Sequence, residues 1–253
     1  MRAFPALPLG RRPIRCRCLV VYRLDPGVVR ALLPPGLQPR TLQGFAIGTA
    51  CYTRLGPTPL FRLNERREGG SDHLSYRIAV LCEDGAEATW IARRETSSWL
   101  EARCGAKLRR GEYARSSFRV KEDAFAIELE VEGEHGEAFY LRGEAAGAVP
   151  NALFASAQAL ESFLGDDRLI RPYDLFAPEA DELDLAGHFA PEPLAVFEAR
   201  AGYFAEGPLA RERAELDSAW RIVNRRLVGV AQRRPTFRGL PDSGTSIPAL
   251  PTT

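Results

Sequence analysis

The chain has 253 residues, of which 45% are hydrophobic and 26% charged, the composition of an ordinary globular protein with enough apolar material for a sizeable core. At this length one large β domain is the expected organisation. The 34 basic and 33 acidic residues leave a formal net charge of +1, which argues against nucleic acid or an anionic membrane as a partner.

The cysteines and the lack of long apolar runs indicate where in the cell the protein is expected. Five cysteines form an odd set without a repeated spacing, which argues against a disulfide framework and for a reducing environment. The first residues contain no apolar run long enough for a signal peptide, and no later segment approaches the roughly 20 apolar residues of a membrane span. We therefore expect a cytoplasmic protein.

Motifs for metals and common cofactors are missing from the sequence. The histidines His73, His135 and His188 lie far apart, and neither a His-Glu-x-x-His motif nor a paired Cys-x-x-Cys spacing occurs. There is also no Walker loop, Gly-x-Ser-x-Gly elbow or Gly-x-Gly-x-x-Gly fingerprint. The sequence thus predicts no metal and no cofactor, and it disfavours P-loop, serine-hydrolase and dinucleotide-binding enzymes.

The first half of the chain is typical of strands around one short helix. Apolar residues alternate over 14–22, which predicts a half-buried strand. Asp25-Pro26 supplies an N-cap and a proline at the first helical position, so a short helix follows. Residues 44–55 and 73–82 are predicted strands joined by a polar loop, and the turn at Glu83-Asp84-Gly85 makes 73–95 a hairpin.

The second half adds further strands. Thr96 or Ser97 is predicted to cap a short helix over 98–104, and the runs 113–120, 125–131 and 138–146 predict an antiparallel meander. An amphipathic helix follows near 156–164, and strand-like runs occupy 194–204 and 219–230.

These elements together favour an α+β fold, mostly antiparallel β, arranged as a closed or nearly closed barrel with a few short helices. Residues 1–13 are expected to be extended, and 14–232 to form a single domain. Residues 233–253, rich in proline, glycine and small polar groups, are expected to be disordered.

The densest polar stretch covers residues 92–101, where a strand runs into the short helix. Because strand side chains alternate, Arg93 and Glu95 face one side if Arg94 faces the other. A buried carboxylate beside a guanidinium would bind a small acid and poise a proton donor. A solvated salt-bridge ladder is the alternative. His73 is a further candidate that Asp72 could orient, unless it makes only a local strand-end hydrogen bond.

Lysine is scarce, since Lys107 and Lys121 are the only two in the chain. Arginine cannot form an imine, so a Schiff-base mechanism would need one of these lysines or the terminal amine. Lys107 and Tyr113 flank an arginine-rich stretch, where nearby positive charge could lower a lysine pKa; a solvated loop lysine is the alternative. Lys121 is expected to be solvated.

Residues 22–37, YRLDPGVVRALLPPGL, resemble the segment that opens acetoacetate decarboxylase-like domains, in which a strand leads through Asp-Pro to a short helix and a leucine-proline-x-glycine-leucine turn. The run GFAIG at 44–48 follows where that superfamily places its next strand. Arg94-Glu95 resembles the arginine-glutamate pair before the catalytic lysine. The resemblance covers roughly residues 15–204 and implies a β-barrel with an internal cavity for a small molecule.

After Glu95 the chain reads TSSWLEA, without the Gly-x-Pro step and the lysine pair of the true decarboxylases. The resemblance is thus to an uncharacterised branch that lacks the Schiff-base lysine, and the imine route is expected to be lost. We expect a barrel that binds, and acts without a Schiff base on, a small organic acid or keto compound; a homo-oligomer is compatible with this. The candidate catalytic residues are Glu95 and Lys107, and the candidate substrate-binding residues are Arg94, Glu101, Tyr113 and His73.

Two alternatives stay open at this point. One is a lyase or decarboxylase acting on a small keto acid with Lys107 as the imine nucleophile. The other is a non-catalytic interaction module whose partner surface is the polar loop at 62–67.

Overall fold

The computed structural model describes residues 14–56, 70–99, 101–103, 112–134, 136–149, 152–156, 159–160, 163, 189–205, 209 and 214–224. Several predictions lie outside these residues, namely the extended segment 1–13, the 62–67 loop, Lys107 and the tail 233–253. Among the described residues, no helix has the length and apolar character needed to cross a membrane.

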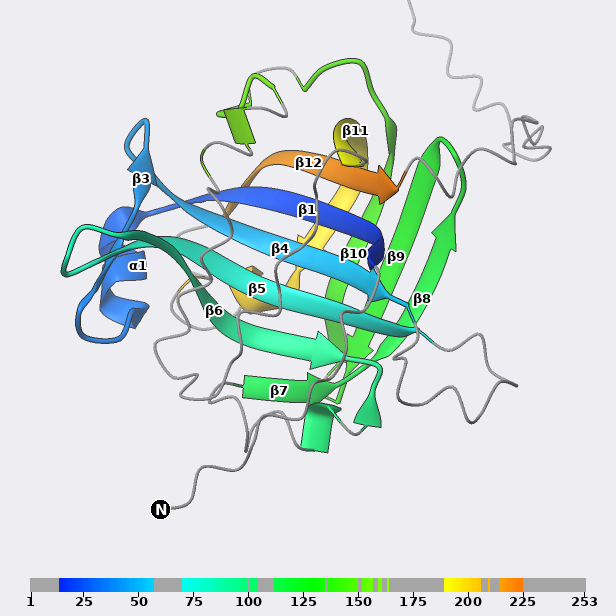
Figure 1. Cartoon of the computed structure of the whole chain (residues 1–253), viewed down its shortest axis with the longest axis horizontal. Helices are drawn as coiled ribbons and strands as arrows, with labels where there is room; N and C mark the ends of the chain where they lie inside the picture. Colours follow the sequence, from blue (N-terminus) through cyan, green and yellow to red (C-terminus); the bar gives the residue numbers. More distant parts are fainter. Residues whose placement is uncertain are drawn as a thin grey trace, which may run out of the picture.

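The described strands form one sheet whose hydrogen-bonded order is β7-β6-β5-β4-β1-β12-β11-β10-β9-β8, with β2 beside β5 and β3 beside β4 (Figure 1). Their bounds are β1 Ile14–Leu24, β2 Leu37–Pro39, β3 Thr41–Leu42, β4 Phe45–Leu55, β5 Ser71–Cys82, β6 Glu87–Thr96, β7 Glu112–Arg115, β8 Ser117–Glu122, β9 Ala126–Gly133, β10 Gly136–Ala145, β11 Phe189–Ala201 and β12 Glu215–Asn224. The helices α1 and α4 span Pro26–Leu32 and Gly202–Ala205.

Ser116 lies at the point where the sheet closes on itself. It alone separates β7 from β8 along the chain, although these strands stand at opposite ends of the sheet order. The sheet therefore curves round into a nearly closed barrel (Figure 1). The predicted meander is confirmed for β8, β9 and β10. The predicted single run at 113–120 is wrong, because its first part pairs with β6, in parallel, and its second part with β9.

The local signals for the predicted helices hold with one correction. At α1, the Asp25 side chain accepts hydrogen bonds from the backbone N–H groups of Gly27 and Val28 at 2.7 and 2.9 Å, as its N-cap position predicts. At the second helix the cap is Ser98, whose hydroxyl accepts from the Glu101 N–H at 3.3 Å. Thr96 and Ser97 do not cap it, because their hydroxyls accept from the N–H groups of Ser98 and Asp72.

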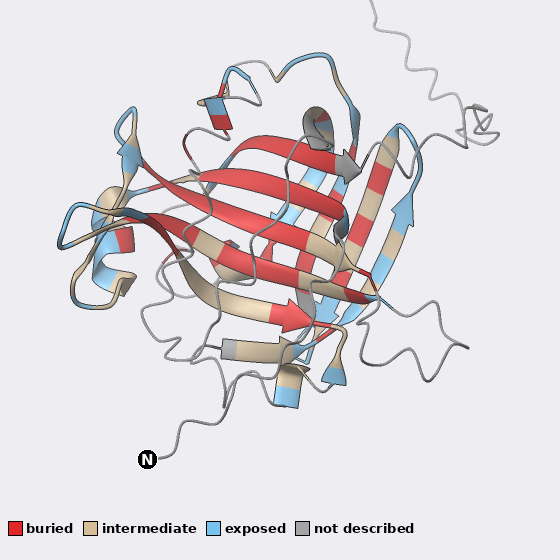
Figure 2. Ribbon diagram, in the orientation of Figure 1, coloured by how far each residue is buried: buried red, intermediate tan, exposed pale blue. Residues whose placement is uncertain are grey.

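Two apolar layers stabilise the barrel. Inside it, alternate residues of the strands form the main core, which includes Val20, Tyr22, Leu74, Tyr76 and Leu129. A second cluster, which includes Leu19, Ile47, Trp220, Phe154 and Leu160, covers the outer face of β1, β4 and β12. Figure 2 shows the result, since β1 and β4 are buried almost throughout while β9 alternates between buried and more exposed positions.

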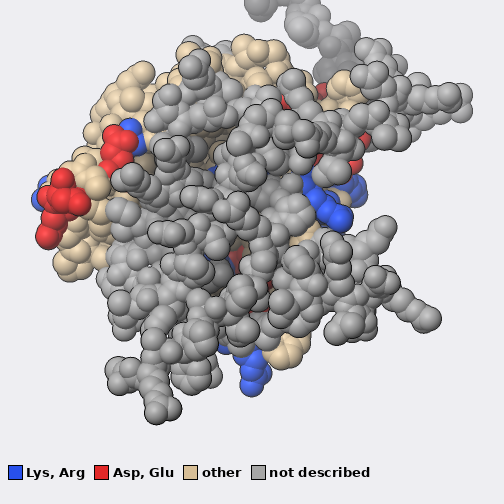
Figure 3. All heavy atoms as spheres, viewed as in Figure 1, with Lys and Arg blue, Asp and Glu red and all other residues tan. Residues whose placement is uncertain are grey.

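The described surface carries charges of both signs. In the space-filling view, basic and acidic groups appear on this face in small separate clusters (Figure 3). On the outer faces of β8 and β9 they pair with each other, as Arg119 does with Glu130 at 3.1 Å and Lys121 with Glu128 at 3.0 Å.

Candidate functional site

The predicted alternation along β6 places a carboxylate and a guanidinium inside the barrel. Glu95 and Arg93 stand opposite the buried core residues Leu74 and Tyr76 of β5. The Glu95 side chain is 0% exposed, and its Oε1 lies 2.7 Å from Nε of Arg93, whose side chain is 17% exposed. Because Glu95 is wholly buried, a solvated ladder at this position is wrong.

Ser116 holds the second oxygen of this carboxylate. Its hydroxyl donates a hydrogen bond to Oε2 of Glu95, and its backbone N–H donates to the carbonyl of Thr96 at 3.0 Å. The Glu95 carboxylate is therefore bound from its own strand by Arg93 and from the closure of the barrel by Ser116. The sequence offered no signal for this residue, since its position depends on the parallel pairing of β7 with β6.

Aromatic side chains fill the interior beside this pair. The Tyr76 ring stacks on Tyr203 at 5.2 Å and meets Phe204 edge-on at 5.6 Å, while the Tyr22 ring lies 5.0 Å from Phe204. Burial raises the pKa of Tyr76, and the Glu95 charge raises it further. Burial also raises the pKa of Tyr22, whose hydroxyl has no hydrogen-bond partner among the described residues. Both phenols therefore remain protonated at neutral pH.

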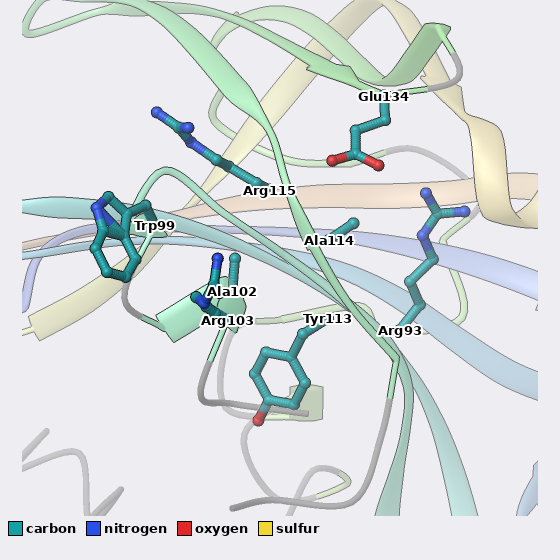
Figure 4. A pocket seen from close by; sticks show the side chains of 8 residues that line it. All are labelled: Arg93, Trp99, Ala102, Arg103, Tyr113, Ala114, Arg115 and Glu134. Carbon is teal, nitrogen blue, oxygen red and sulfur yellow. The ribbon is translucent and has the colours of Figure 1, made fainter. Parts of the chain in front are cut away.

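A half-open cavity of about 610 Å³ lies along β7. Its lining comprises Arg93, Trp99, Ala102, Arg103, Tyr113, Ala114, Arg115 and Glu134 (Figure 4). Figure 4 shows Arg93, Ala114 and Glu134 to one side of β7, with Trp99, Ala102 and Arg103 to the other. Ala114 pairs with Glu95 across the strands, so a small side chain lies between the buried carboxylate and the cavity.

Arg94 faces away from Glu95, because neighbouring residues of a strand point to opposite faces. One guanidinium nitrogen donates to the Tyr113 hydroxyl at 2.9 Å, and the guanidinium carbon lies 5.4 Å from the centre of the Tyr113 ring. Tyr113 lines the cavity. Arg94 does not line it but contacts the Tyr113 side chain. The arginine that shares the interior with Glu95 is Arg93.

The structure brings His73 and Glu101 together on the outer side of the sheet. Nδ1 of His73 lies 3.4 Å from Oε2 of Glu101, and Nε2 lies 2.6 Å from the hydroxyl oxygen of Ser71. Orientation of His73 by Asp72 is wrong, because the Asp72 carboxylate accepts from the Tyr52 hydroxyl at 2.6 Å and from Arg54 at 2.9 Å. His73 and Glu101 instead connect the short helix to β5.

The two lysines and a metal site are the remaining questions from the sequence. Lys107 lies outside the described residues. Lys121 is solvated as predicted, with a side chain that is 80% exposed and pairs with Glu128. The described residues contain no group of three or more His, Cys, Asp or Glu side chains able to hold a metal ion.

Comparison with known proteins gives a fold relationship. No family model and no curated protein matches the sequence. Among solved structures, an acetoacetate decarboxylase matches with a TM-score of 0.53 and 14% identity over 86% of both chains. The enduracididine biosynthesis enzyme MppR, complexed with pyruvate, matches with a TM-score of 0.52 and 11% identity over 85% of this chain and 86% of that one.

The acetoacetate decarboxylase of Legionella pneumophila matches over 60% of this chain and 57% of its own, with a TM-score of 0.45 and 14% identity. The two fuller matches show that this chain has the acetoacetate decarboxylase-like fold, a mostly antiparallel and nearly closed barrel.

Proposed function

We propose that this protein binds a small organic acid or keto compound beside the Arg93–Glu95 pair and acts on it by proton transfer, without a Schiff base. The observation that carries the proposal is a fully buried carboxylate held by Arg93 and Ser116 next to a cavity that Arg93 also lines. The shared fold adds support, because MppR, which has this fold, is described in complex with pyruvate.

The chemistry follows from the arrangement of the two charges. Arginine presents several N–H donors in one plane and binds carboxylates and polarised carbonyls through them. Arg93 directs Nε toward Glu95 and also lines the cavity, so one side chain connects the ligand to the carboxylate. Glu95 does not itself line the cavity, since Ala114 lies between them, so the ligand must pass Ala114 for Glu95 to take a proton from a carbon next to its carbonyl. That step is general acid–base chemistry.

Proton exchange provides the test. In D2O, the wild-type chain is expected to accelerate exchange of the methyl protons of pyruvate, followed by NMR. Glu95→Gln keeps the shape and the Ser116 hydrogen bond but removes the proton acceptor, so the rate should fall by about 100-fold or more. Glu144→Gln, on the exposed side of β10, is the matched control and should exchange like wild type.

Binding is tested separately by calorimetry with pyruvate and acetoacetate. A single Arg93 variant would leave Glu95 as an uncompensated buried charge and destabilise the barrel, so the paired variant Arg93→Gln with Glu95→Gln is used. It should lose affinity at least tenfold while still folding by circular dichroism. Equal affinity and exchange rates in all variants would support a non-catalytic interaction module instead.

The imine alternative is separated by trapping. Borohydride reduction in the presence of pyruvate or acetoacetate should leave no adduct in the mass spectrum of the intact chain. An adduct at Lys107 would contradict the proposal and assign the covalent route to that lysine.

A further inference from the structure

We infer that the cavity binds an aromatic organic acid around the edge strand β7. Its ring lies against Trp99 and Tyr113, and its anionic group is bound by Arg103 and Arg115, on the side of β7 away from Glu95 (Figure 4). This rests on the proposed function for the acid-binding character of the cavity, and it goes further in naming the substrate class. Three properties of the cavity lead to it, namely its size, its charge and its aromatic wall.

The first property is size. The cavity of about 610 Å³ falls within the range of roughly 300–1,000 Å³ that is typical of pockets for ligands of drug size. A three- or four-carbon acid would leave most of that space to water. A ligand that uses the whole cavity must extend well beyond the Arg93–Glu95 pair.

The second property is an excess of positive charge. Among the described residues, the lining contains three arginines and one glutamate, and Arg93 is already neutralised by Glu95. The side chains of Arg103 and Arg115 are exposed and pair with no acidic group within the part of the chain that the structure describes. These two guanidinium groups outnumber Glu134, so the cavity favours an anion.

The third property is the aromatic wall. Trp99 is 57% exposed, an unusual degree of exposure for so large an apolar ring. Tyr113 supplies the second ring, whose hydroxyl accepts a hydrogen bond from Arg94 and whose centre lies 5.4 Å from the Arg94 guanidinium carbon. A planar ligand ring would bury part of both surfaces, which aromatic pairs reward beyond the area they bury.

Side-chain contacts connect the short helix that carries Trp99 and Arg103 to β5. Ser98 caps its first turn, and Glu101 contacts His73, which in turn contacts Ser71 on β5. This arrangement makes His73 and Glu101 positioning residues for the aromatic wall. Preorganised side chains lose less conformational freedom on binding.

The test compares three keto acids on the full chain by calorimetry. Phenylpyruvate is the aromatic probe, 4-methyl-2-oxopentanoate is a branched aliphatic acid of intermediate size, and pyruvate is the small acid. We expect phenylpyruvate to bind at least about fivefold more tightly than the aliphatic acid, and the aliphatic acid more tightly than pyruvate. Equal affinity for the aromatic and aliphatic acids would overturn the inference.

Variants assign the effect to residues. Trp99→Ala should weaken phenylpyruvate about fivefold or more and leave pyruvate nearly unchanged, and Arg103→Gln with Arg115→Gln should weaken both acids. The matched controls are Phe197→Ala, at a residue that is 60% exposed, and Arg142→Gln, exposed on β10; both should bind like wild type. Unchanged phenylpyruvate binding by Trp99→Ala contradicts the aromatic wall.

Failure of the inference and failure of the proposed function give different results. If all three acids bind equally and only Glu95→Gln abolishes proton exchange, the proposed function holds and the substrate class is wrong. If Trp99→Ala weakens phenylpyruvate while Glu95→Gln changes no exchange rate, the aromatic site holds and the catalytic proposal is wrong. Absence of binding by any acid contradicts both.

Discussion

The buried carboxylate of Glu95 affects the stability of the barrel through the side chains that bind it. Glu95 is 0% exposed and lies beside a core of apolar and aromatic side chains. A buried carboxylate is tolerated when hydrogen bonds and an opposite charge compensate for its lost hydration. Arg93 and Ser116 provide that compensation, and each therefore contributes to stability through Glu95.

Ser116 gives the first stability prediction. Ser116→Ala removes the donor to Oε2 of Glu95 and leaves a buried acceptor without it, which should lower the free energy of unfolding by about 1–3 kcal/mol. Urea denaturation measures the change. The neighbouring Ser117 is exposed and reaches Glu132 only at 3.5 Å, so Ser117→Ala should change the stability far less. Similar losses in the two variants would contradict the role of Ser116.

Cys51 gives a pH prediction. Burial raises the pKa of this thiol, but the charges of Arg17 and Arg77 and a 3.3 Å hydrogen bond from Arg17 Nε outweigh burial and leave the pKa below its ordinary value. A lowered folded-state pKa adds stability above the unfolded-state pKa of about 8.5 and loses it as pH falls through the folded-state value.

The measurement is the free energy of unfolding against pH for wild type and Cys51→Ser. Because other groups also titrate, the difference between the two curves isolates Cys51. That difference should move in favour of wild type as pH rises from the lowered pKa to about 8.5. A difference that does not vary with pH would show that Arg17 and Arg77 do not stabilise the thiolate.

At the scale of elements, β7 is the segment that creates the site. It is four residues long and pairs in parallel with β6, which places Ala114 opposite Glu95 and directs Tyr113 and Arg115 to the other face. Periodicity within residues 113–120 predicts a strand but cannot reveal that one residue in its middle carries the chain to the opposite end of the sheet. The break becomes visible only from the pairing of β7 with β6 and of β8 with β9.

Ala114 gives the prediction for this element. Ala114→Val adds volume where the cavity approaches Glu95 and should weaken binding of keto acids about tenfold or more, with little change in melting temperature because valine suits a strand. Calorimetry and thermal denaturation measure the two effects. Ala195→Val, at an exposed position of β11, is the control. Undiminished binding by the Ala114 variant would place the ligand away from this face of β7.

Other elements show where reasoning from sequence reaches its limit. The Asp25-Pro26 helix start and the turn after β5 are local signals, and both are confirmed. The alternation along β6 also placed Arg93 with Glu95 correctly. The same alternation puts Asp72 and His73 on opposite faces of β5, so the expected contact between them was inconsistent with the strand. The contact of His73 with Glu101 depends on tertiary packing.

At the scale of the whole molecule, closure of the sheet turns separate strands into an enclosed interior. The sequence favoured a barrel because many short strands are separated by turn signals, and the fold of the structural neighbours agrees. The strand order could not be predicted from the sequence, because β1 pairs with both β4 and β12, which are far apart in the chain. The resemblance of residues 22–37 to acetoacetate decarboxylase-like domains supplied the fold that periodicity alone left open.

The central claim is that ligands bind at the Arg93–Glu95 pair without a covalent bond to a lysine. A crystal structure of the protein with phenylpyruvate tests it most directly. We predict the ligand's carbonyl oxygen within hydrogen-bond distance of Arg93, and Glu95 facing the carbon beside the carbonyl. Electron density for an imine to Lys107, or for a ligand away from Arg93, would contradict the account.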